Sequence, residues 1–251
     1  MARITTAFGE PSPPEIDPQE VAAFFADRAR RMDEVGPTCA VIYQDKQGDL
    51  AERRDAAEIG HVLPILRLDG RQSLLDVGCG TGRWSRRLVP HVKRYHGIDS
   101  TEGLLAHARA QHLDDPHCRF TYLHAEQLSA AALGEAEFDR VLCAGICIYL
   151  NDAQLAALFN AICDVTSSSA LVLLREPIAV DSRLTLKGYF SAELEHDYHA
   201  IYRSAPELMA LLQPTLLAAG FRLIGEGDVY AQDGLNNRAE TRQRWFLLER
   251  T

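Results

Sequence analysis

Lysine is scarce in this chain, and the overall charge has the wrong sign for a nucleic-acid-binding protein. Only three of the 26 basic residues are lysines, and 35 acidic residues give a formal net charge of −9. Binding to nucleic acid independently of base sequence requires clustered cations that neutralise phosphates. The composition therefore argues against nucleic acid as a partner and favours a small-molecule substrate.

Cys-x-x-Cys pairs and long apolar runs are also missing. The six cysteines include no Cys-x-x-Cys pair, which argues against a zinc knuckle or a disulfide framework and for reduced thiols in a cytoplasm. No stretch approaches the roughly 20 apolar residues of a membrane span. A signal peptide needs an apolar run near the amino terminus, and this chain has prolines and acidic residues there instead. We expect a cytoplasmic protein that does not contact membranes.

After Gly70 the chain alternates short apolar runs with helical segments. One helix begins behind an Asn151-x-x-Gln154 capping box and carries apolar residues at helical spacing. Five apolar runs separated by helices predict an α/β fold, a parallel sheet with helices on both faces. Two final runs without a helix between them predict an antiparallel pair at the sheet edge. The seven runs are Leu74–Val77, Tyr95–Ile98, Phe120–Leu123, Val141–Ala144, Ala170–Leu174, Phe221–Ile224 and Trp245–Leu248.

The first 69 residues lack this alternation and predict an amino-terminal arm followed by a helical cap. The first dozen residues show no periodicity and are expected to form a loose arm. Asp17 is placed to cap a helix that starts at Pro18, and a second helical stretch spans about 50–63. We therefore divide the chain into a cap, residues 1–69, and a catalytic core, residues 70–251, with an insertion at about 178–204.

A glycine-rich turn follows the first strand of the core. Gly78, Gly80 and Gly82 stand at alternate positions after Asp76. Glycines there permit positive φ and let a ligand lie against bare backbone. The spacing differs from the Gly-x-Gly-x-x-Gly of dinucleotide-binding loops. Asp99, which is followed by Ser100, ends the next strand 21 residues after Gly78, where an acid can accept hydrogen bonds from ribose hydroxyls.

Together these segments resemble motifs I and II of the class I S-adenosylmethionine-dependent methyltransferases. The run from Phe138 to Gly145 is similar to the family's fourth motif, and the final strand pair is similar to its antiparallel hairpin. The resemblance implies a seven-stranded, mostly parallel Rossmann-like sheet that ends in an antiparallel C-terminal hairpin, and S-adenosylmethionine as cofactor.

The same resemblance implies where the cofactor binds. Asp76, Gly78 and Gly80 would face its methionine part, and Asp99 with Ser100 would face the ribose. Ala125 and Glu126 would face the adenine, and Cys143 would lie where a strand end faces the sulfonium. This chain has His124 where many relatives have an acid, so Glu126 or no side chain contacts the adenine amino group.

The fourth motif also indicates the subclass. Residues 142–149 contain no acid to hold magnesium, no Pro-Pro-Tyr of the kind found in aminopurine methylases, and no Pro-Cys nucleophile. We predict a metal-free methyltransferase with a small-molecule acceptor, acting as a monomer or a homodimer.

Aromatic residues of the insertion and of the fourth-motif exit are the candidate acceptor site. If the insertion is helical, Tyr198 and Tyr202 share one face with Glu195. Such a cluster suits a sulfonium or an amine, although the same tyrosines could simply pack the insertion onto the core. Tyr43 of the cap is a further candidate. The predicted catalytic residues are Tyr149, Tyr189, His196, Tyr198 and Tyr202.

Two other functions fit the same sequence. An enzyme of this fold could cyclise S-adenosylmethionine to azetidine-2-carboxylate and release methylthioadenosine. A non-catalytic partner subunit would bind the cofactor without turning it over. S-adenosylhomocysteine as product indicates methyl transfer, whereas methylthioadenosine indicates cyclisation.

Overall fold

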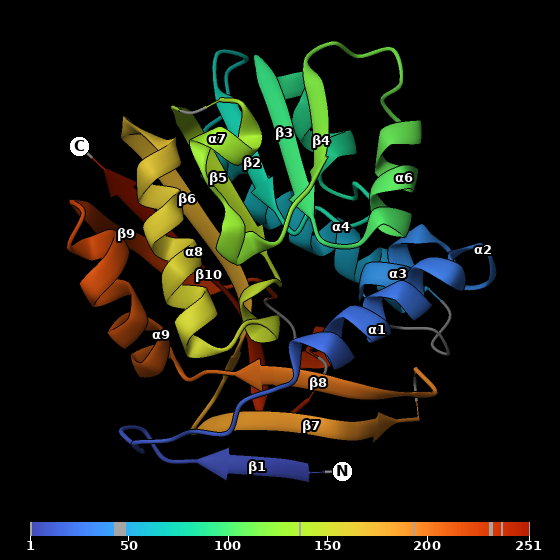
Figure 1. Ribbon diagram of the computed structural model, residues 1–251, viewed down its shortest axis with the longest axis vertical. Helices are drawn as coiled ribbons and strands as arrows, with labels where there is room; N and C mark the ends of the chain where they lie inside the picture. The colour runs from blue at the N-terminus through green and yellow to red at the C-terminus, as the bar shows by residue number, and fades with distance from the viewer. Residues whose placement is uncertain are drawn as a thin grey trace.

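A computed structural model describes residues 2–42, 49–135, 137–192, 194–230, 233–236 and 238–250 (Figure 1). Its main sheet has seven strands in the order β4-β3-β2-β5-β6-β10-β9. The five strands from β4 to β6 run parallel, and β10 is antiparallel to both β6 and β9. The strands are β2 (Ser73–Val77), β3 (Arg94–Asp99), β4 (Cys118–Tyr122), β5 (Phe138–Ala144), β6 (Thr166–Ala179), β9 (Phe221–Asp228) and β10 (Thr241–Arg250).

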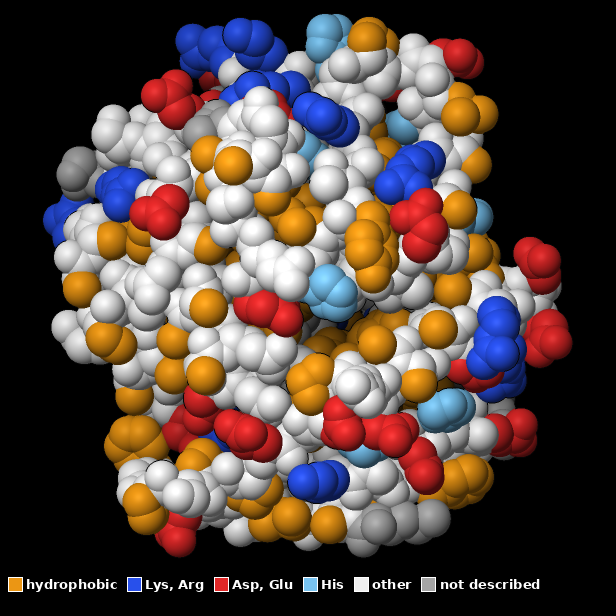
Figure 2. All heavy atoms as spheres, in the orientation of Figure 1, with side chains coloured by type: hydrophobic (Ala, Val, Ile, Leu, Met, Phe, Trp, Pro, Cys, Tyr) orange, Lys and Arg blue, Asp and Glu red, His pale blue; other side chains and the backbone are white. Residues whose placement is uncertain are grey.

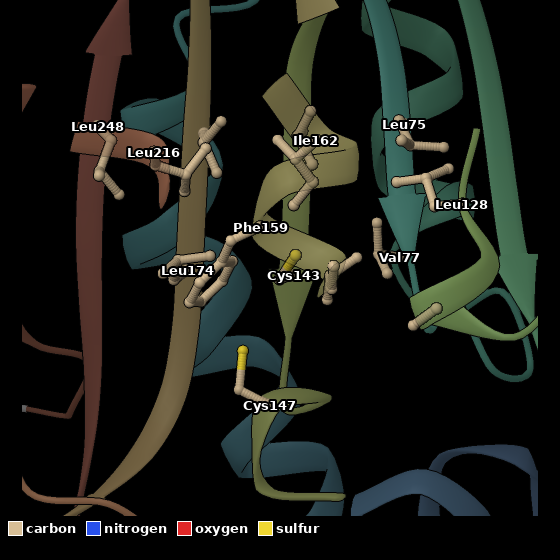
Figure 3. Close-up of a cluster of buried hydrophobic side chains, with 14 of the residues drawn as sticks. Leu75, Val77, Leu128, Cys143, Cys147, Phe159, Ile162, Leu174, Leu216 and Leu248 are labelled. Atoms are coloured by element: carbon tan, nitrogen blue, oxygen red, sulfur yellow. The ribbon is translucent and has the colours of Figure 1, made fainter. Parts of the chain in front are cut away.

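Both faces of this sheet are buried, which confirms the predicted arrangement. On one face, α8 (Asp152–Val165) and α9 (Ala205–Leu212) begin at the capping boxes of Asn151 and Ser204. Figure 3 shows Phe159 and Ile162 of α8 packed over Leu75, Cys143 and Leu174 of the strands. On the other face, α4 (Leu50–Val62) and Trp84 pack against the sheet.

Smaller elements complete the core. The helices α5 (Ser85–Leu88), α6 (Glu102–Ala110) and α7 (Ala130–Leu133) connect the parallel strands. Short single turns lie at the ends of larger elements: η1 (Leu63–Leu66), η2 (Val89–His91), η3 (Ala125–Gln127), η4 (Cys147–Tyr149), η5 (Gln213–Leu217) and η6 (Asp233–Leu235).

A second sheet corrects two expectations. The first residues are not a loose arm, because β1 (Ala2–Thr6) pairs antiparallel with β7 (Arg183–Ser191). The insertion is not helical at Tyr198 and Tyr202, because β8 (His196–Tyr202) pairs with β7. The three strands, in the order β1-β7-β8, lie below the main sheet in Figure 1. The sheet therefore joins the start of the chain to the insertion.

The first helix of the cap lies between the two sheets (Figure 1). The helix α1 (Pro18–Arg30) packs Phe24 against Tyr198 of β8, and Asp17 caps it by accepting a hydrogen bond from the Gln19 amide. The helices α2 (Met32–Val35) and α3 (Pro37–Ile42) follow. The Asn151 side chain exchanges two hydrogen bonds with the backbone of Ile16, at 2.9 and 3.0 Å. The entry to α1 is therefore tied to the start of α8.

Two further observations concern the described residues. No helix among them is long and apolar enough to cross a membrane. All six cysteines lie among them, and each is a free thiol.

Candidate active site

A cavity of about 370 Å³ lies at the carboxyl ends of β2, β3, β5 and β6, under helices α1 and α3. Ligands of open parallel sheets bind at this edge. Figure 2 shows a recess near the centre of the molecular surface in this view, lined by hydrophobic side chains. The cavity is continuous from the glycine loop and Asp99 to Tyr149, Tyr198 and Tyr202.

The glycine loop has the backbone that its sequence predicts. Gly78, Gly80 and Gly82 have φ values of 75°, 54° and 76°, a region that L side chains rarely adopt. The amides of Gly78 and Cys79 donate to the carbonyl of Ile98 at 2.8 and 3.0 Å. A Cβ on Gly80 would lie 3.0 Å from Val41 Cγ1 of the cap. The loop therefore presents bare backbone to the cavity where the cap approaches most closely.

Asp99 lines the cavity beside this loop. Its Oδ2 accepts a hydrogen bond from the Gly80 amide at 3.0 Å, and its Oδ1 accepts one from the Thr101 amide at 2.8 Å. Burial raises the pKa of Asp99, and the two backbone amides oppose that rise. Each carboxylate oxygen keeps a second lone pair, so Asp99 can still accept hydrogen bonds from a ligand. Ser100, an exposed residue, lines the same part of the cavity.

Asp76 is buried behind the loop and does not line the cavity. The Tyr95 hydroxyl donates to its Oδ2 at 2.5 Å, and burial raises the pKa of Asp76 to about 7. The position differs from the direct contact with the methionine part that the resemblance implies. Asp76 instead supports the loop from behind, through β2 and β3.

The adenine side of the predicted site lies at the end of β4. Ala125, Glu126 and His124 line the cavity there. The Glu126 carboxylate accepts a hydrogen bond from Gln154 Nε2 at 3.2 Å, while Gln154 Oε1 caps α8 by accepting from the Asn151 amide. Glu126 is thus held at the cavity by the same capping box that anchors the cap, and its contact with adenine stays a prediction.

The exit of β5 differs from the prediction at Cys143. The Cys143 side chain is fully buried and points toward α8 in the hydrophobic cluster of Figure 3, away from the cavity. Gly145 and Ile146 line the cavity instead. Glu176 fixes this loop from below, because its Oε1 accepts hydrogen bonds from three consecutive amides, those of residues 145–147, at 3.1–3.2 Å.

The buried carboxyl of Glu176 makes stability depend on pH. Burial raises its pKa from 4.5 to about 7. The folded protein therefore holds a proton between these pH values that the unfolded chain has released, so stability falls as the pH rises from about 4.5 to 7. We expect Glu176→Gln to remove a slope of at most about 1.4 kcal/mol per pH unit. Urea unfolding of the wild type and the variant at pH 5, 6 and 7 measures it. Parallel pH curves, with the exposed Glu102→Gln as control, would contradict this role.

The five predicted catalytic residues divide into two groups. Tyr149, Tyr198 and Tyr202 line the cavity, whereas Tyr189 and His196 do not. The hydroxyls of Tyr149 and Tyr198 are 2.8 Å apart, and the Tyr202 hydroxyl donates to that of Tyr198 at 3.5 Å. Tyr43 lies outside the described residues. The structure thus brings together three of the five candidates, and their catalytic roles remain predictions.

Arg238 and Phe25, which sequence reasoning missed, complete this aromatic end. Arg238 Nη1 donates to the Tyr202 hydroxyl at 2.9 Å, and its guanidinium carbon lies 5.6 Å from the centre of the Tyr202 ring. Phe25 of α1 lines the cavity and packs edge-on against Tyr149, with ring centres 4.9 Å apart. The cap therefore contributes directly to the wall next to the tyrosines.

A buried ionic cluster on the cavity wall was also not predicted. Glu58 of α4 binds two arginines: its Oε1 accepts from Arg83 at 3.0 Å, and its Oε2 accepts from Arg175 at 2.7 Å. Arg83 also donates to Asp55 at 2.8 Å. Glu58, Arg83 and Arg175 all line the cavity and are less than one-tenth exposed. The signal in the sequence is Arg175-Glu176 directly after the apolar run Ala170–Leu174, since charged residues are seldom fully buried unless paired.

Across the described parts of the chain, no group of three or more His, Cys, Asp or Glu side chains is arranged to hold a metal ion.

Comparisons with known proteins agree with this geometry. Residues 74–169 match the model of a methyltransferase domain family. The probable S-adenosylmethionine-dependent methyltransferase CRG1 of Saccharomyces cerevisiae is 27% identical over 135 residues, which cover 53% of this chain and 46% of that protein.

Solved structures with a similar fold include a methyltransferase and a cyclase. Phosphoethanolamine N-methyltransferase 1 of Haemonchus contortus, in complex with phosphoethanolamine and S-adenosylhomocysteine, has a TM-score of 0.70 at 16% identity, over 90% of this chain and 48% of that one. The cyclase SpnF has a TM-score of 0.67 at 17% identity, over 94% and 98%. The chain spans about half the length of the yeast and Haemonchus proteins. Residues 74–169 thus resemble a methyltransferase domain, and the whole chain shares its fold with solved structures that include a methyltransferase.

Proposed function

We propose that this protein binds S-adenosylmethionine in the cavity and transfers its methyl group to a small acceptor without a metal ion. The observation that carries the proposal is the single cavity that joins the glycine loop and Asp99 to the tyrosine hydroxyls. The bare backbone at Gly80 and the spare lone pairs of Asp99 fit the sugar and sulfonium parts of the cofactor. When bound, the cofactor supplies an electrophilic methyl group.

The protein's part in such a transfer is alignment and exclusion of water. In-line displacement is accelerated mainly by holding the two reactants in the reactive geometry. Tyr198, between the hydroxyls of Tyr149 and Tyr202, is placed to orient an acceptor. Residues of α1 and α3 line the cavity from above and exclude water from it.

Product analysis tests this function directly. The purified protein is incubated with S-adenosylmethionine and candidate small acceptors, in the presence of excess EDTA, and all products are identified by mass spectrometry. We expect S-adenosylhomocysteine and a methylated acceptor at a rate that EDTA leaves unchanged. Loss of turnover in EDTA that magnesium restores would contradict the metal-free mechanism.

Cyclisation of the cofactor is a second candidate, favoured by the size of the cavity. About 370 Å³ is near the lower end of the roughly 300–1,000 Å³ usual for small-molecule pockets, which leaves little room for an acceptor beside the cofactor. In this reaction the amine of the aminobutyryl chain displaces methylthioadenosine and loses a proton, giving azetidine-2-carboxylate. Release of methylthioadenosine from S-adenosylmethionine alone would replace the methyltransferase proposal with this one.

Tyr198→Phe separates a catalytic role from a packing role. The variant keeps the ring that packs against Phe24 and Tyr149 and removes only the hydroxyl at the centre of the network. We expect turnover to fall roughly tenfold with cofactor affinity nearly unchanged, the signature of a contact made in the transition state. Tyr189→Phe, from the same sheet but outside the cavity, is the matched control. Equal activity of both variants would remove the tyrosine network from the mechanism.

A further inference from the structure

Three polar side chains share one end of the cavity, on the face of the main sheet that also carries the ionic cluster. Arg175 of β6 and Gln243 of β10 line the cavity, as does Tyr230 directly after β9. In the antiparallel pairing, Gln243 lies opposite Pro177 and Trp245 lies opposite Arg175. Arg175 and Gln243 are therefore diagonal neighbours on one face. The Val229 amide donates to the Gln243 carbonyl at 2.8 Å, which sets Tyr230 beside them.

These side chains have hydrogen-bonding capacity that the described residues do not use. Arg175 Nη2 donates to Glu58 at 2.7 Å and to the Tyr230 hydroxyl at 3.4 Å. Arg175 Nε and Gln243 Oε1 are buried and have no hydrogen-bond partner in the part of the chain that is described. A half-turn of the Gln243 carboxamide presents its NH2 in place of the oxygen. Unpaired buried polar groups are costly, so they indicate a missing partner.

Tyr230 adds a second donor. Its hydroxyl oxygen accepts from Arg175, so its own proton is directed elsewhere. Burial raises the pKa of Tyr230, which keeps the hydroxyl protonated at neutral pH. Tyr230 is 6% exposed and lines the cavity. A guanidinium N–H, a phenolic O–H and an amide group therefore meet at one place.

Among the described contacts, the neighbouring carboxylates accept no hydrogen bond from Arg175 Nε or from the Tyr230 hydroxyl. Glu58 accepts from Arg83 on one oxygen and from Arg175 Nη2 on the other. Glu176 belongs to the opposite face of β6, where its Oε1 holds the amides of residues 145–147. Glu58 thus holds the Arg175 guanidinium in place, and the N–H groups of Arg175 that do not bind Glu58 are available to a ligand.

We propose that Arg175, Tyr230 and Gln243 form a carboxylate subsite, so that the group bound at this end of the cavity belongs to a carboxylic acid. The inference rests on the proposed function for its cofactor. A carboxylate has two oxygens in one plane and a single charge, which suits one guanidinium and two neutral donors. The carboxylate has two possible sources, a separate acidic acceptor or the methionine tail of the cofactor.

Calorimetry with three probes distinguishes these sources. S-adenosylhomocysteine carries the tail carboxylate and methylthioadenosine lacks it. Benzoate and its neutral analogue benzamide are titrated into the protein with and without S-adenosylhomocysteine. If an acceptor is the source, Tyr230→Phe and Gln243→Leu weaken benzoate binding by roughly tenfold and leave benzamide and both nucleosides unchanged. If the cofactor tail is the source, the same variants weaken S-adenosylhomocysteine and leave methylthioadenosine unchanged.

The variants are chosen so that a loss of binding cannot be attributed to unfolding of the protein. Arg175→Met removes the central donor but also leaves Glu58 with one arginine. Tyr230→Phe and Gln243→Leu keep the Arg175–Glu58 ion pair intact. Tyr189→Phe and the exposed Arg67→Met are controls. Unchanged binding of both benzoate and S-adenosylhomocysteine in these variants would overturn the subsite. Failure of the wild type to bind either nucleoside would overturn the proposed function instead, and the benzoate arm would still test the subsite.

Discussion

Replacement of Asp99 by alanine is expected to weaken binding of S-adenosylmethionine and S-adenosylhomocysteine by about 2–4 kcal/mol, roughly 30- to 1,000-fold. The carboxylate lines the cavity and accepts one backbone amide on each oxygen, from Gly80 and from Thr101. Its removal deletes the acceptors for the ribose hydroxyls and also releases the glycine loop. Isothermal titration calorimetry measures the change in affinity.

The control for this experiment is Glu102→Ala, three residues further along the chain. Glu102 is exposed and pairs only with Arg109 among the contacts described, and such surface pairs contribute at most about 1 kcal/mol. We expect the control to bind the cofactor normally. Normal affinity in Asp99→Ala, with a melting temperature equal to that of the wild type, would show that the ribose binds elsewhere.

Glu58→Ala is expected to cost about 3–5 kcal/mol of stability, because it leaves two buried guanidinium groups without their shared carboxylate. Arg83 and Arg175 each pair with a different oxygen of Glu58, and both are less than one-tenth exposed. Denaturant unfolding at pH 7 measures the loss. Glu249, the partly exposed partner of the exposed Arg67, provides the control Glu249→Ala, for which the expected cost is under about 1 kcal/mol.

A second variant distinguishes charge from packing at this position. Glu58→Gln preserves the shape and one acceptor oxygen, so we expect an intermediate cost. A cost below about 1 kcal/mol for Glu58→Ala would mean that water replaces the carboxylate, and the ionic cluster would then be a solvated wall of the cavity.

The main sheet could be predicted because its signals are local. Each apolar run is bounded by residues that are typical of turns. Helices α8 and α9 begin directly after the capping residues Asn151 and Ser204, as their sequence pattern indicates. The glycine loop and Asp99 follow from spacing within one strand–turn–helix–strand unit. Such short-range patterns fix strand identity and topology without knowledge of distant contacts.

The second sheet could not be predicted because β1 and β7, which pair in it, lie far apart in the sequence. Ala2 pairs with Lys187, and no property of residues 2–6 indicates that partner. Tyr198 and Tyr202 were assigned to one face on helical spacing, and they share a face in β8 as well, because a separation of four residues suits both periods. The assignment of the two tyrosines to one face was therefore right although the secondary structure was wrong, and Glu195, which was predicted to share that face, lies outside β8.

The ionic cluster was missed for a different physical reason. Mixed charges on a helix, such as Arg54, Asp55 and Glu58, are usually exposed, so their sequence alone does not indicate a buried cluster. Only the approach of Arg83 and Arg175 from other elements makes Glu58 a buried group. Burial of a charge depends on its partners in space, which a linear pattern does not contain.

The position of β10 between β6 and β9 has a consequence for synthesis on the ribosome. β9 contacts the sheet through β10 alone in the strand order, although β9 is made first. The nascent chain can therefore complete β2, β3 and the glycine loop early, whereas β9 must wait for residues 241–250 to emerge. Gln243 arrives with this last strand. The end of the cavity with Arg175, Tyr230 and Gln243 thus closes only after residues 241–250 have been made, which is later than the synthesis of the glycine loop.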